Sequence, residues 1–207
     1  MANAQRRAAL LDAAIEVLAA QGARGLTFRA VDAEASVPAG TTSNYFASRD
    51  ELLTQAGGRI YQRLAPDAAT VARGLAEPRD HDRVVELVHQ LTERITAYRS
   101  GHLALLELRL EATRRPALRH VLTATVLTDL RAVISYHLDT GLPGNATTAV
   151  LLYLAVNWLV LEQLTLPDVL LEVAGSDFDH LVTTVVQHVL HGAAAQMPSR
   201  SEASPQT

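Results

Sequence analysis

The chain has 207 residues, of which 48% are hydrophobic and 19% charged, and its 18 basic and 22 acidic side chains give a formal charge of −4. This length supports one or two domains with a core large enough to fold without cross-links. The chain has no cysteine, which excludes disulfides, thiolate zinc sites, iron–sulfur clusters and cysteine nucleophiles. The negative net charge argues against polyanion binding over the whole surface and leaves room for a local basic site.

The N-terminal residues do not resemble a secretory signal, because their two arginines are followed only by short, alanine-rich apolar runs. The most apolar segment, residues 149–161, is shorter than the ~20 residues that cross a bilayer. We therefore expect a soluble, cytoplasmic protein with no membrane contact.

The first 46 residues predict three helices. Apolar side chains at three- and four-residue spacing indicate an amphipathic helix over residues 5–20, and the glycines that follow end it. Thr27 is a suitable N-cap for a second helix that runs to about residue 35. Pro38 suits the first turn of a brief third helix that ends near residue 46.

A capping box follows this segment. Ser48 can accept a hydrogen bond from the Glu51 amide while the Glu51 carboxylate bonds the Ser48 amide, which predicts that a long helix over 49–64 begins here. Gly101 is expected to separate the next two helices. The remaining predicted helices are residues 80–99, 102–114, 117–139, 145–165 and 177–194.

No segment alternates apolar and polar residues over a strand's length, and no hairpin turn motif occurs. The predicted fold is therefore all-α, with about nine helices. Residues 196–207 contain little that a core would bury, and we expect them to form a disordered tail.

Two short helices that are joined by a tight turn and follow a longer one indicate a helix-turn-helix DNA reader. Six small residues, Ala39 and Gly40 among them, precede Asn44 and Tyr45, as suits a helix that approaches DNA closely. Arg7 to Leu53 resembles the DNA-binding domain of the tetracycline-repressor (TetR) family. The matching pieces are Leu10–Ala14, Gly22, Leu26–Val31, Ala35–Val37, Gly40–Thr41, Tyr45–Phe46 and Ser48–Leu53.

The chain departs from the family's pattern at two places. Ser36 occupies the turn position that glycine usually holds, and Thr42-Ser43 replaces the usual Leu-Tyr pair. The second change removes an apolar anchor and a phenol that would contact a phosphate.

The resemblance implies that Ala39, Gly40 and Asn44 face base edges, joined by Arg29 from the second helix. Asparagine can bond adenine bidentately and arginine can bond guanine, which supports these roles. The resemblance also implies phosphate contacts, for which the residues are Thr27, Thr41, Ser43, Tyr45 and Arg49. It divides the chain into a DNA-binding domain at 1–48 and a ligand-binding and dimerisation domain at 49–195.

The last two predicted helices favour a homodimer. The helix over 146–166 is apolar on nearly all sides, so that a partner chain must cover one of its faces. The last helix carries a broad apolar stripe, for which the expected interface residues are Phe178, Leu181, Val182, Val185, Val186 and Val189. Two DNA-binding domains, one from each chain and one DNA turn apart, would bind a pseudo-palindromic operator in double-stranded DNA.

A small-molecule effector site is expected among the middle helices, where isolated polar groups interrupt apolar walls. The candidate residues are Asn157, Trp158, His102 and Glu107. His188 and His191 share a helix face, but this helix offers them no carboxylate partner, so we predict no metal site. The sequence also contains no cofactor or catalytic motif.

The predicted function is a ligand-responsive transcriptional regulator that represses by binding its operator and is released by a small molecule. An alternative class is a helical small-molecule or lipid-binding protein whose helix-turn-helix no longer binds DNA. Ser36, Thr42-Ser43 and the weak positive charge of residues 1–49, five arginines against four acidic side chains, favour that alternative. An enzyme is not predicted.

Overall fold

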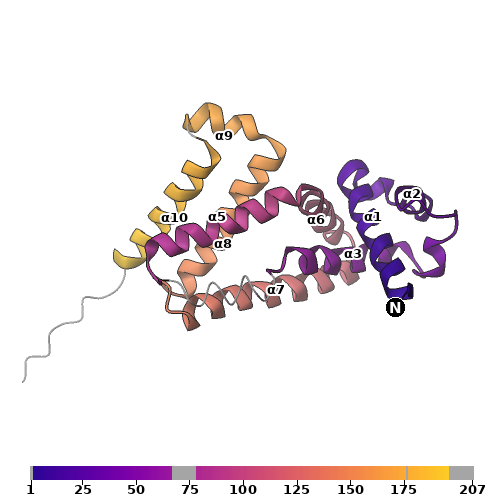
Figure 1. Cartoon of the computed structure of the whole chain (residues 1–207), viewed down its shortest axis with the longest axis horizontal. Helices are drawn as coiled ribbons and strands as arrows, with labels where there is room; N and C mark the ends of the chain where they lie inside the picture. The colour runs from indigo at the N-terminus through magenta and orange to yellow at the C-terminus, as the bar shows by residue number, and fades with distance from the viewer. Residues whose placement is uncertain (1, 67–77, 176, 196–207) are drawn as a thin grey trace, which may run out of the picture. The chain divides into compact units, whose positions relative to one another are not determined.

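The computed structural model describes residues 2–66, 78–175 and 177–195, and within them it contains nine α-helices, one 3₁₀ helix and no strand (Figure 1). The all-α prediction is confirmed. The elements are α1 (Ala2–Gly25), α2 (Phe28–Glu34), η1 (Thr42–Asn44), α3 (Arg49–Leu64), α5 (His81–Ala97), α6 (Arg99–Ala112), α7 (Pro116–Asp139), α8 (Ala146–Thr165), α9 (Pro167–Ala174) and α10 (Phe178–Ala195). The tail predicted at 196–207 lies outside the described residues.

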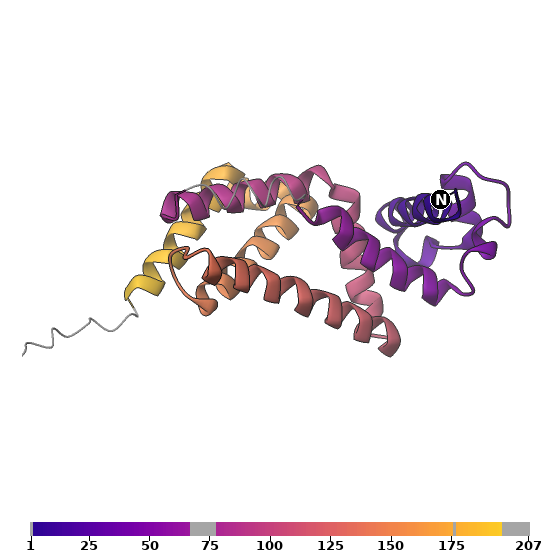
Figure 2. The same ribbon diagram turned by 60° about the horizontal axis from the view of Figure 1, so that its bottom comes forward.

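The described residues divide into two compact units, one containing residues 2–66 and 92–131 and the other containing 78–91, 132–175 and 177–195. α7, which Figure 2 shows as one unbroken helix, contributes residues to both units. In the first unit α1 packs on α2, α3 and α6. The apolar core of this unit also includes residues beyond position 48, because Leu52, Leu53 and Ile60 of α3 are fully buried in it. The domain boundary at residue 48 stays a prediction.

α1 runs past its predicted end, with an interruption at Gly22. This glycine has φ 66° and ψ −178°, a conformation that a side chain would oppose, and it turns the chain out of the helix for one residue. The Ala23 N–H donates to Oε2 of Glu107 at 3.0 Å. Arg49 donates to the carbonyl oxygens of Ala23 and Leu26, the latter at 2.9 Å. Tertiary contacts thus satisfy the backbone groups around the end of α1.

α2 begins and ends as predicted. Thr27 is its N-cap, and the Thr27 hydroxyl oxygen accepts from the Ala30 N–H at 3.1 Å. At the C-terminus the Ser36 N–H donates to Ala33 O and the Val37 N–H donates to Asp32 O, which is the hydrogen-bond pattern of a Schellman motif. Ser36 holds the left-handed position of this motif at φ 52°. The departure from glycine noted in the sequence is therefore a site of backbone strain.

Replacing Ser36 with glycine is expected to raise the free energy of unfolding by about 0.5–1 kcal/mol. The left-handed conformation costs a residue with a Cβ ~1–2 kcal/mol, and the greater freedom of glycine in the unfolded chain offsets part of that gain. Urea denaturation of the purified protein measures the change. Ser36→Ala is the matched control, because it keeps the Cβ. A glycine variant no more stable than the alanine variant would contradict this account.

Gly101 does not break a helix, contrary to the prediction. It lies buried inside α6, and the chain instead leaves helical geometry at Tyr98 (φ −106°, ψ 53°). A Cβ at Gly101 would lie 2.2 Å from a ring carbon of Tyr98, so glycine is needed here to make room for that ring. The Arg63 guanidinium covers the ring at 3.9 Å from its centroid. The glycine thus serves packing between α3 and the start of α6.

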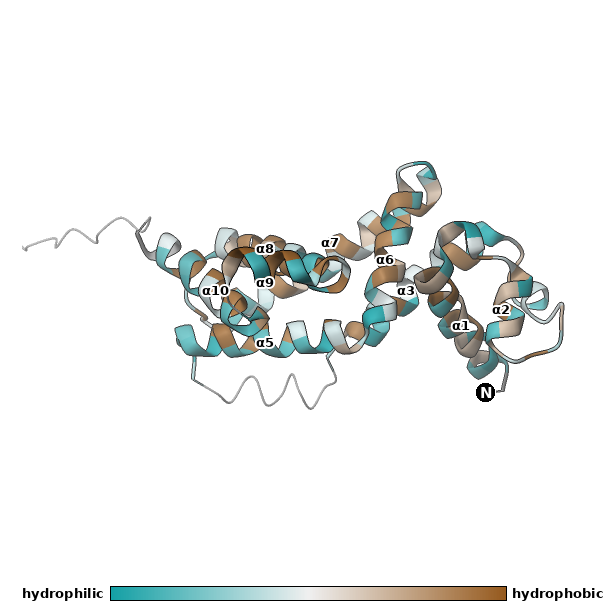
Figure 3. Cartoon of the chain, turned by 90° about the horizontal axis from the view of Figure 1, so that it is seen from above, coloured by the Kyte–Doolittle hydropathy of each residue, from teal (hydrophilic) through white to brown (hydrophobic). Residues whose placement is uncertain are grey.

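In the second unit α8 packs on α9 and α10, and Asn145 caps α8 in a capping box with Thr148. α9 was not predicted from the sequence; it begins at Pro167 and ends at Ala174, and Gly175 follows it in the left-handed conformation. The helix predicted over 145–165 is confirmed as α8. By length and composition alone, the 20 residues of α8 could cross a membrane. Within its apolar 18-residue stretch, 39% of the residues are buried in the structure. Figure 3 shows the apolar colouring of α8 and α9.

Candidate nucleic-acid interface

The segment between α2 and α3 carries most of the predicted DNA contacts. The sequence predicted a third helix over 38–46, but only Thr42–Asn44 are helical, as one 3₁₀ turn. Gly40 has φ 89°, which no right-handed helix accommodates. The prediction is wrong for a second reason as well, because a carboxylate of α2 takes two backbone N–H groups of this segment as partners. We call residues 37–46 the recognition segment.

Asp32 is the residue that binds these N–H groups. Its side chain is buried, with only 3% of the residue exposed. Oδ2 accepts from the Gly40 N–H at 2.7 Å, and Oδ1 accepts from the Thr42 N–H at 2.7 Å and the Thr42 hydroxyl at 2.5 Å. Burial acts to raise the pKa of Asp32, but the hydrogen bonds from Thr42 and the backbone outweigh it and lower this pKa below its usual value.

Arg7 holds the other end of the recognition segment. Its guanidinium donates to the Tyr45 carbonyl at 2.6 Å, to Gln55 at 2.9 Å and to Glu51 at 2.8 Å, and it lies 4.6 Å from the centroid of the Phe46 ring. Sequence reasoning missed Arg7 and Asp32. For Asp32 the available signal was a carboxylate placed beside the buried Val31, followed eight to ten residues later by small and hydroxyl-bearing residues.

The four residues predicted to face bases all lie on the surface. Ala39 and Gly40 are exposed at the start of the recognition segment, and Asn44 is exposed at its 3₁₀ turn. Arg29 is exposed on α2. Within the described residues no hydrogen bond engages the side chain of Arg29 or Asn44, so both can donate to base edges.

The five residues predicted at phosphates have different surroundings. Thr27 is exposed, and its hydroxyl proton is not used by its capping bond. The hydroxyls of Thr41 and Ser43 donate within the recognition segment, to Pro38 O at 2.5 Å and Gly40 O at 2.7 Å. The partly buried Tyr45 packs against the core, and Arg49 is bound to the end of α1. Thr27 therefore suits a phosphate contact best, whereas Arg49 has a structural role in this chain.

The N-terminus of α3 confirms half of the predicted capping box. The Ser48 hydroxyl accepts from the Glu51 N–H at 3.1 Å. The Glu51 carboxylate, however, bonds the Ala47 N–H at 2.7 Å rather than the amide of Ser48. Its other oxygen accepts from Arg7 and Gln55, which draws the carboxylate one residue further back along the chain.

The four residues predicted to bind an effector are divided between the two units. His102 and Glu107 belong to the first unit, and Asn157 and Trp158 to the second. Glu107 is bound to Ala23, and Asn157 donates to Tyr153 O at 2.7 Å. Burial, and then the charge of Arg109, lower the pKa of His102.

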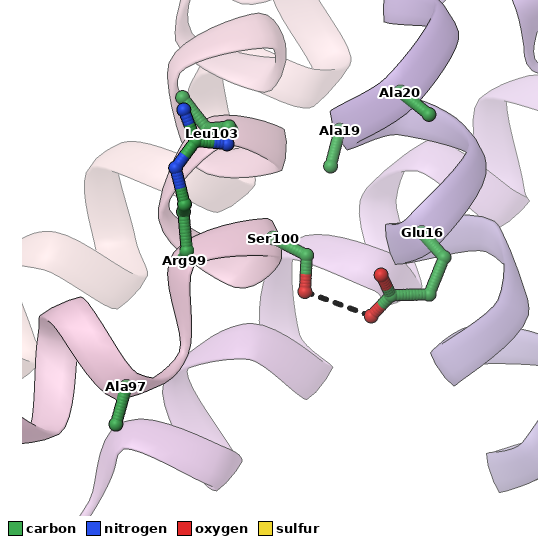
Figure 4. Close-up of a pocket in the computed structure, with 7 residues that line it drawn as sticks. All are labelled: Glu16, Ala19, Ala20, Ala97, Arg99, Ser100 and Leu103. Carbon is green, nitrogen blue, oxygen red and sulfur yellow. Dashed lines mark hydrogen bonds between the residues drawn. The ribbon is translucent and has the colours of Figure 1, made fainter. Parts of the chain in front are cut away.

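An open groove of about 400 Å³ lies on the first unit beside α1 and the start of α6, where the Ser100 hydroxyl donates to Glu16 at 2.8 Å (Figure 4). Its other lining residues are Ala19, Ala20, Ala97, Arg99 and Leu103. None of the four predicted effector residues lines this groove.

The predicted dimer face lies on α10, and the structure divides it. Val182 and Val186 are fully buried within their own chain, so they leave no surface for a partner. The other four are partly exposed and follow one side of the helix: Phe178, Leu181, Val185 and Val189. On α8 the exposed apolar side chains are Leu151, Leu154 and Trp158, spaced so that they share one helix face.

Two family models match this chain. The model for bacterial regulatory proteins of the tetR family matches residues 10–56, which contain α2 and the recognition segment. The model for the tetracyclin repressor-like C-terminal domain matches residues 79–192, more than half of the chain. The chain belongs to the tetracycline repressor family. It is a TetR-family transcriptional regulator with an N-terminal helix-turn-helix.

Individual relatives agree with this assignment. The HTH-type transcriptional repressor KstR of Mycolicibacterium smegmatis is 34% identical over 90 residues, which cover 44% of this chain and 43% of KstR, so less than half of that relative's length is matched. A transcriptional regulator from Rhodococcus sp. Rha1 has the same fold, with a TM-score of 0.68, 21% identity and coverage of 90% and 97% of the two chains. The multidrug binding protein EbrR in complex with ethidium has a TM-score of 0.63 and is 28% identical in sequence. The match covers 89% of this chain and 97% of the EbrR chain.

Proposed function

We propose that this TetR-family regulator is a cytoplasmic repressor that binds a pseudo-palindromic operator as a homodimer and is released by a small molecule. The exposed group formed by Arg29, Ala39, Gly40 and Asn44 carries the DNA-binding part of the proposal. The group combines two side chains that can form hydrogen bonds with two small residues that allow the backbone close to the base edges. The roles of these residues come from the family resemblance, and their exposure supports them.

The dimer proposal rests on the apolar faces of the second unit. Leu151, Leu154 and Trp158 of α8 are 47%, 56% and 63% exposed, and the opposite face of α8 is buried. An apolar helix face of this kind, together with the partly exposed stripe of α10, matches what a self-complementary interface of two helices from each chain requires. We infer that a second copy, and not a membrane, covers this face.

Effector release needs a path between the helix-turn-helix and the rest of the first unit. α3 offers one, because it packs on both α1 and α6. Asp12 of α1 accepts from Arg59 of α3 at 2.9 Å through both carboxylate oxygens, and Arg63 of α3 covers the Tyr98 ring at the start of α6. EbrR was solved with ethidium bound, and we infer that this chain also responds to a small molecule. A tenfold loss of operator affinity needs only ~1.4 kcal/mol of coupling.

Salt dependence of DNA binding tests the proposal. Neutralised phosphates release counterions, so affinity for a duplex from the region upstream of the chain's own gene is expected to fall steeply as salt rises. If two heads each neutralise two phosphates, the loss between 50 and 200 mM salt is about 100-fold. Fluorescence anisotropy with the full chain measures it. The absence of saturable binding at low salt would contradict the proposal and favour a helical ligand-binding protein without DNA binding.

A further inference from the structure

Asp32 has a role that its burial does not explain. Placing a carboxylate on the inner side of a helix is costly, because burial penalises its charged form. Asp32 nevertheless has a pKa below the usual value, since two N–H groups and one hydroxyl donate to its oxygens. Nothing in α2 itself needs this group. The Thr27 hydroxyl caps α2 at its start and the Schellman motif closes it at its end.

All three donors to Asp32 belong to the recognition segment. The Gly40 N–H and the Thr42 N–H lie on either side of Thr41 and are bound by different oxygens of one carboxylate. The two bonds therefore fix both the position and the direction of the backbone here. Thr42 is fully buried, and its hydroxyl makes the third hydrogen bond to Asp32. This bond takes the place of the apolar contact that the family's usual leucine would make at this position.

The 3₁₀ turn begins at Thr42 and ends at Asn44, so its first residue is held by Asp32 and its last is one of the predicted base contacts. A turn of three residues has little regularity of its own to set its direction. We propose that Asp32 is a positioning residue for DNA recognition, whose buried carboxylate sets the path of the backbone from Gly40 to Asn44 and thereby aims the Asn44 side chain. This inference rests on the proposed function only for its DNA readout.

Asp32→Asn tests the charge with no change in shape. An asparagine side chain has one acceptor oxygen, so one of the two N–H groups then faces an amide NH₂ instead of a carboxylate oxygen. Thr42→Val removes only the hydroxyl bond and is the milder variant. Glu34→Gln is the matched control, because Glu34 is an exposed acidic residue on the same helix.

The first measurement does not involve DNA. Amide hydrogen exchange at Gly40 and Thr42 is expected to accelerate at least tenfold in Asp32→Asn at one of these two positions, while exchange in the buried core of α1 stays within twofold. Glu34→Gln is expected to change neither. Unchanged exchange at both amides would overturn the inference, whether or not the protein binds DNA.

The second measurement compares a duplex enriched by the wild-type protein from a random pool with an unrelated duplex. Asp32→Asn is expected to lose at least tenfold in affinity for the enriched duplex and less than twofold for the unrelated one, because no phosphate contact is removed. Equal loss on both duplexes, or no loss, would overturn the role in recognition. If Asp32→Asn does not fold, Thr42→Val decides the same comparison, with an expected loss of about threefold on the enriched duplex alone. Should the wild type enrich no duplex, the proposed function fails, and the exchange rates separately decide whether Asp32 holds the segment.

Discussion

Asn44→Ala is expected to relax the sequence preference at one base pair of each half-site, and Arg29→Ala to relax it at another. Each good bidentate contact discriminates against the wrong base by ~1–3 kcal/mol, which corresponds to about 5- to 150-fold in affinity. Both side chains are exposed and without a hydrogen bond in the described residues, so alanine at either position removes no contact that holds the head together. Stability is therefore expected to stay within ~0.5 kcal/mol of the wild type.

The measurement is a selection of random duplexes on the purified full chain, repeated with each variant. Asn44→Ala is expected to lose its preference for adenine at the contacted position, and Arg29→Ala its preference for guanine. The preference at all other positions should persist, because well-separated base contacts act nearly additively. Glu34→Gln serves again as the control on the exposed side of α2. Two alanine variants that retain the complete wild-type preference would show that these side chains do not read bases.

The recognition segment shows where local sequence rules stop. Spacing of apolar residues and capping residues predicted α2, α3, α5, α7, α8 and α10 with ends within about three residues. The same rules predicted a helix over 38–46, because Pro38 suits the first turn of a helix. The carboxylate that accepts hydrogen bonds from the Gly40 and Thr42 N–H groups belongs to Asp32 of α2, a separate helix. Competition between a side chain and the helical hydrogen-bond pattern is visible only when both partners are placed in space.

The candidate site residues divide along the same line. Exposure of Arg29 and Asn44 agrees with what the family resemblance implied. Glu107 and Arg49 carry charges that the sequence analysis assigned to an effector and to a phosphate, yet both bind backbone groups near the kink of α1. Nothing local to Glu107 indicates this use, since its partner lies 84 residues earlier in the chain.

The spacing of apolar residues also did not indicate which residues of the α10 stripe pack within the chain and which are left for a partner. A stripe that is wide enough to meet both its own chain and a partner does not indicate which residues serve which neighbour. Val182 and Val186 are completely buried within their own chain, whereas Leu181, Val185 and Val189 are partly exposed. α9 was missed for a related reason, since its apolar residues Val169, Leu171 and Val173 are exposed and do not pack into the core that the pattern rules look for.

Trp158→Glu is expected to convert a dimer into a monomer. Trp158 is 63% exposed, so the change removes little packing within the chain and should leave its helical content unchanged. In a two-fold interface, each chain would place a charge where an indole was buried. Central aromatic residues of interfaces contribute ~2–4 kcal/mol, and a desolvated carboxylate without a partner adds to the loss. The dimer dissociation constant is therefore expected to rise at least about 100-fold, equivalent to ~2.7 kcal/mol.

Sedimentation equilibrium over a range of protein concentrations measures this constant. Leu110→Glu is the matched control, because Leu110 is a similarly exposed apolar residue (57%) on α6 of the first unit and is not one of the predicted interface residues, so its replacement should leave the constant unchanged. Loss of the dimer also predicts loss of operator binding, since the second head then no longer gains from the attachment of the first. Affinity for a two-half-site duplex should drop to that for a single half-site. A wild-type chain that stays monomeric at micromolar concentration and sediments with lipid vesicles would show that a bilayer, and not a second copy, covers the exposed face of α8.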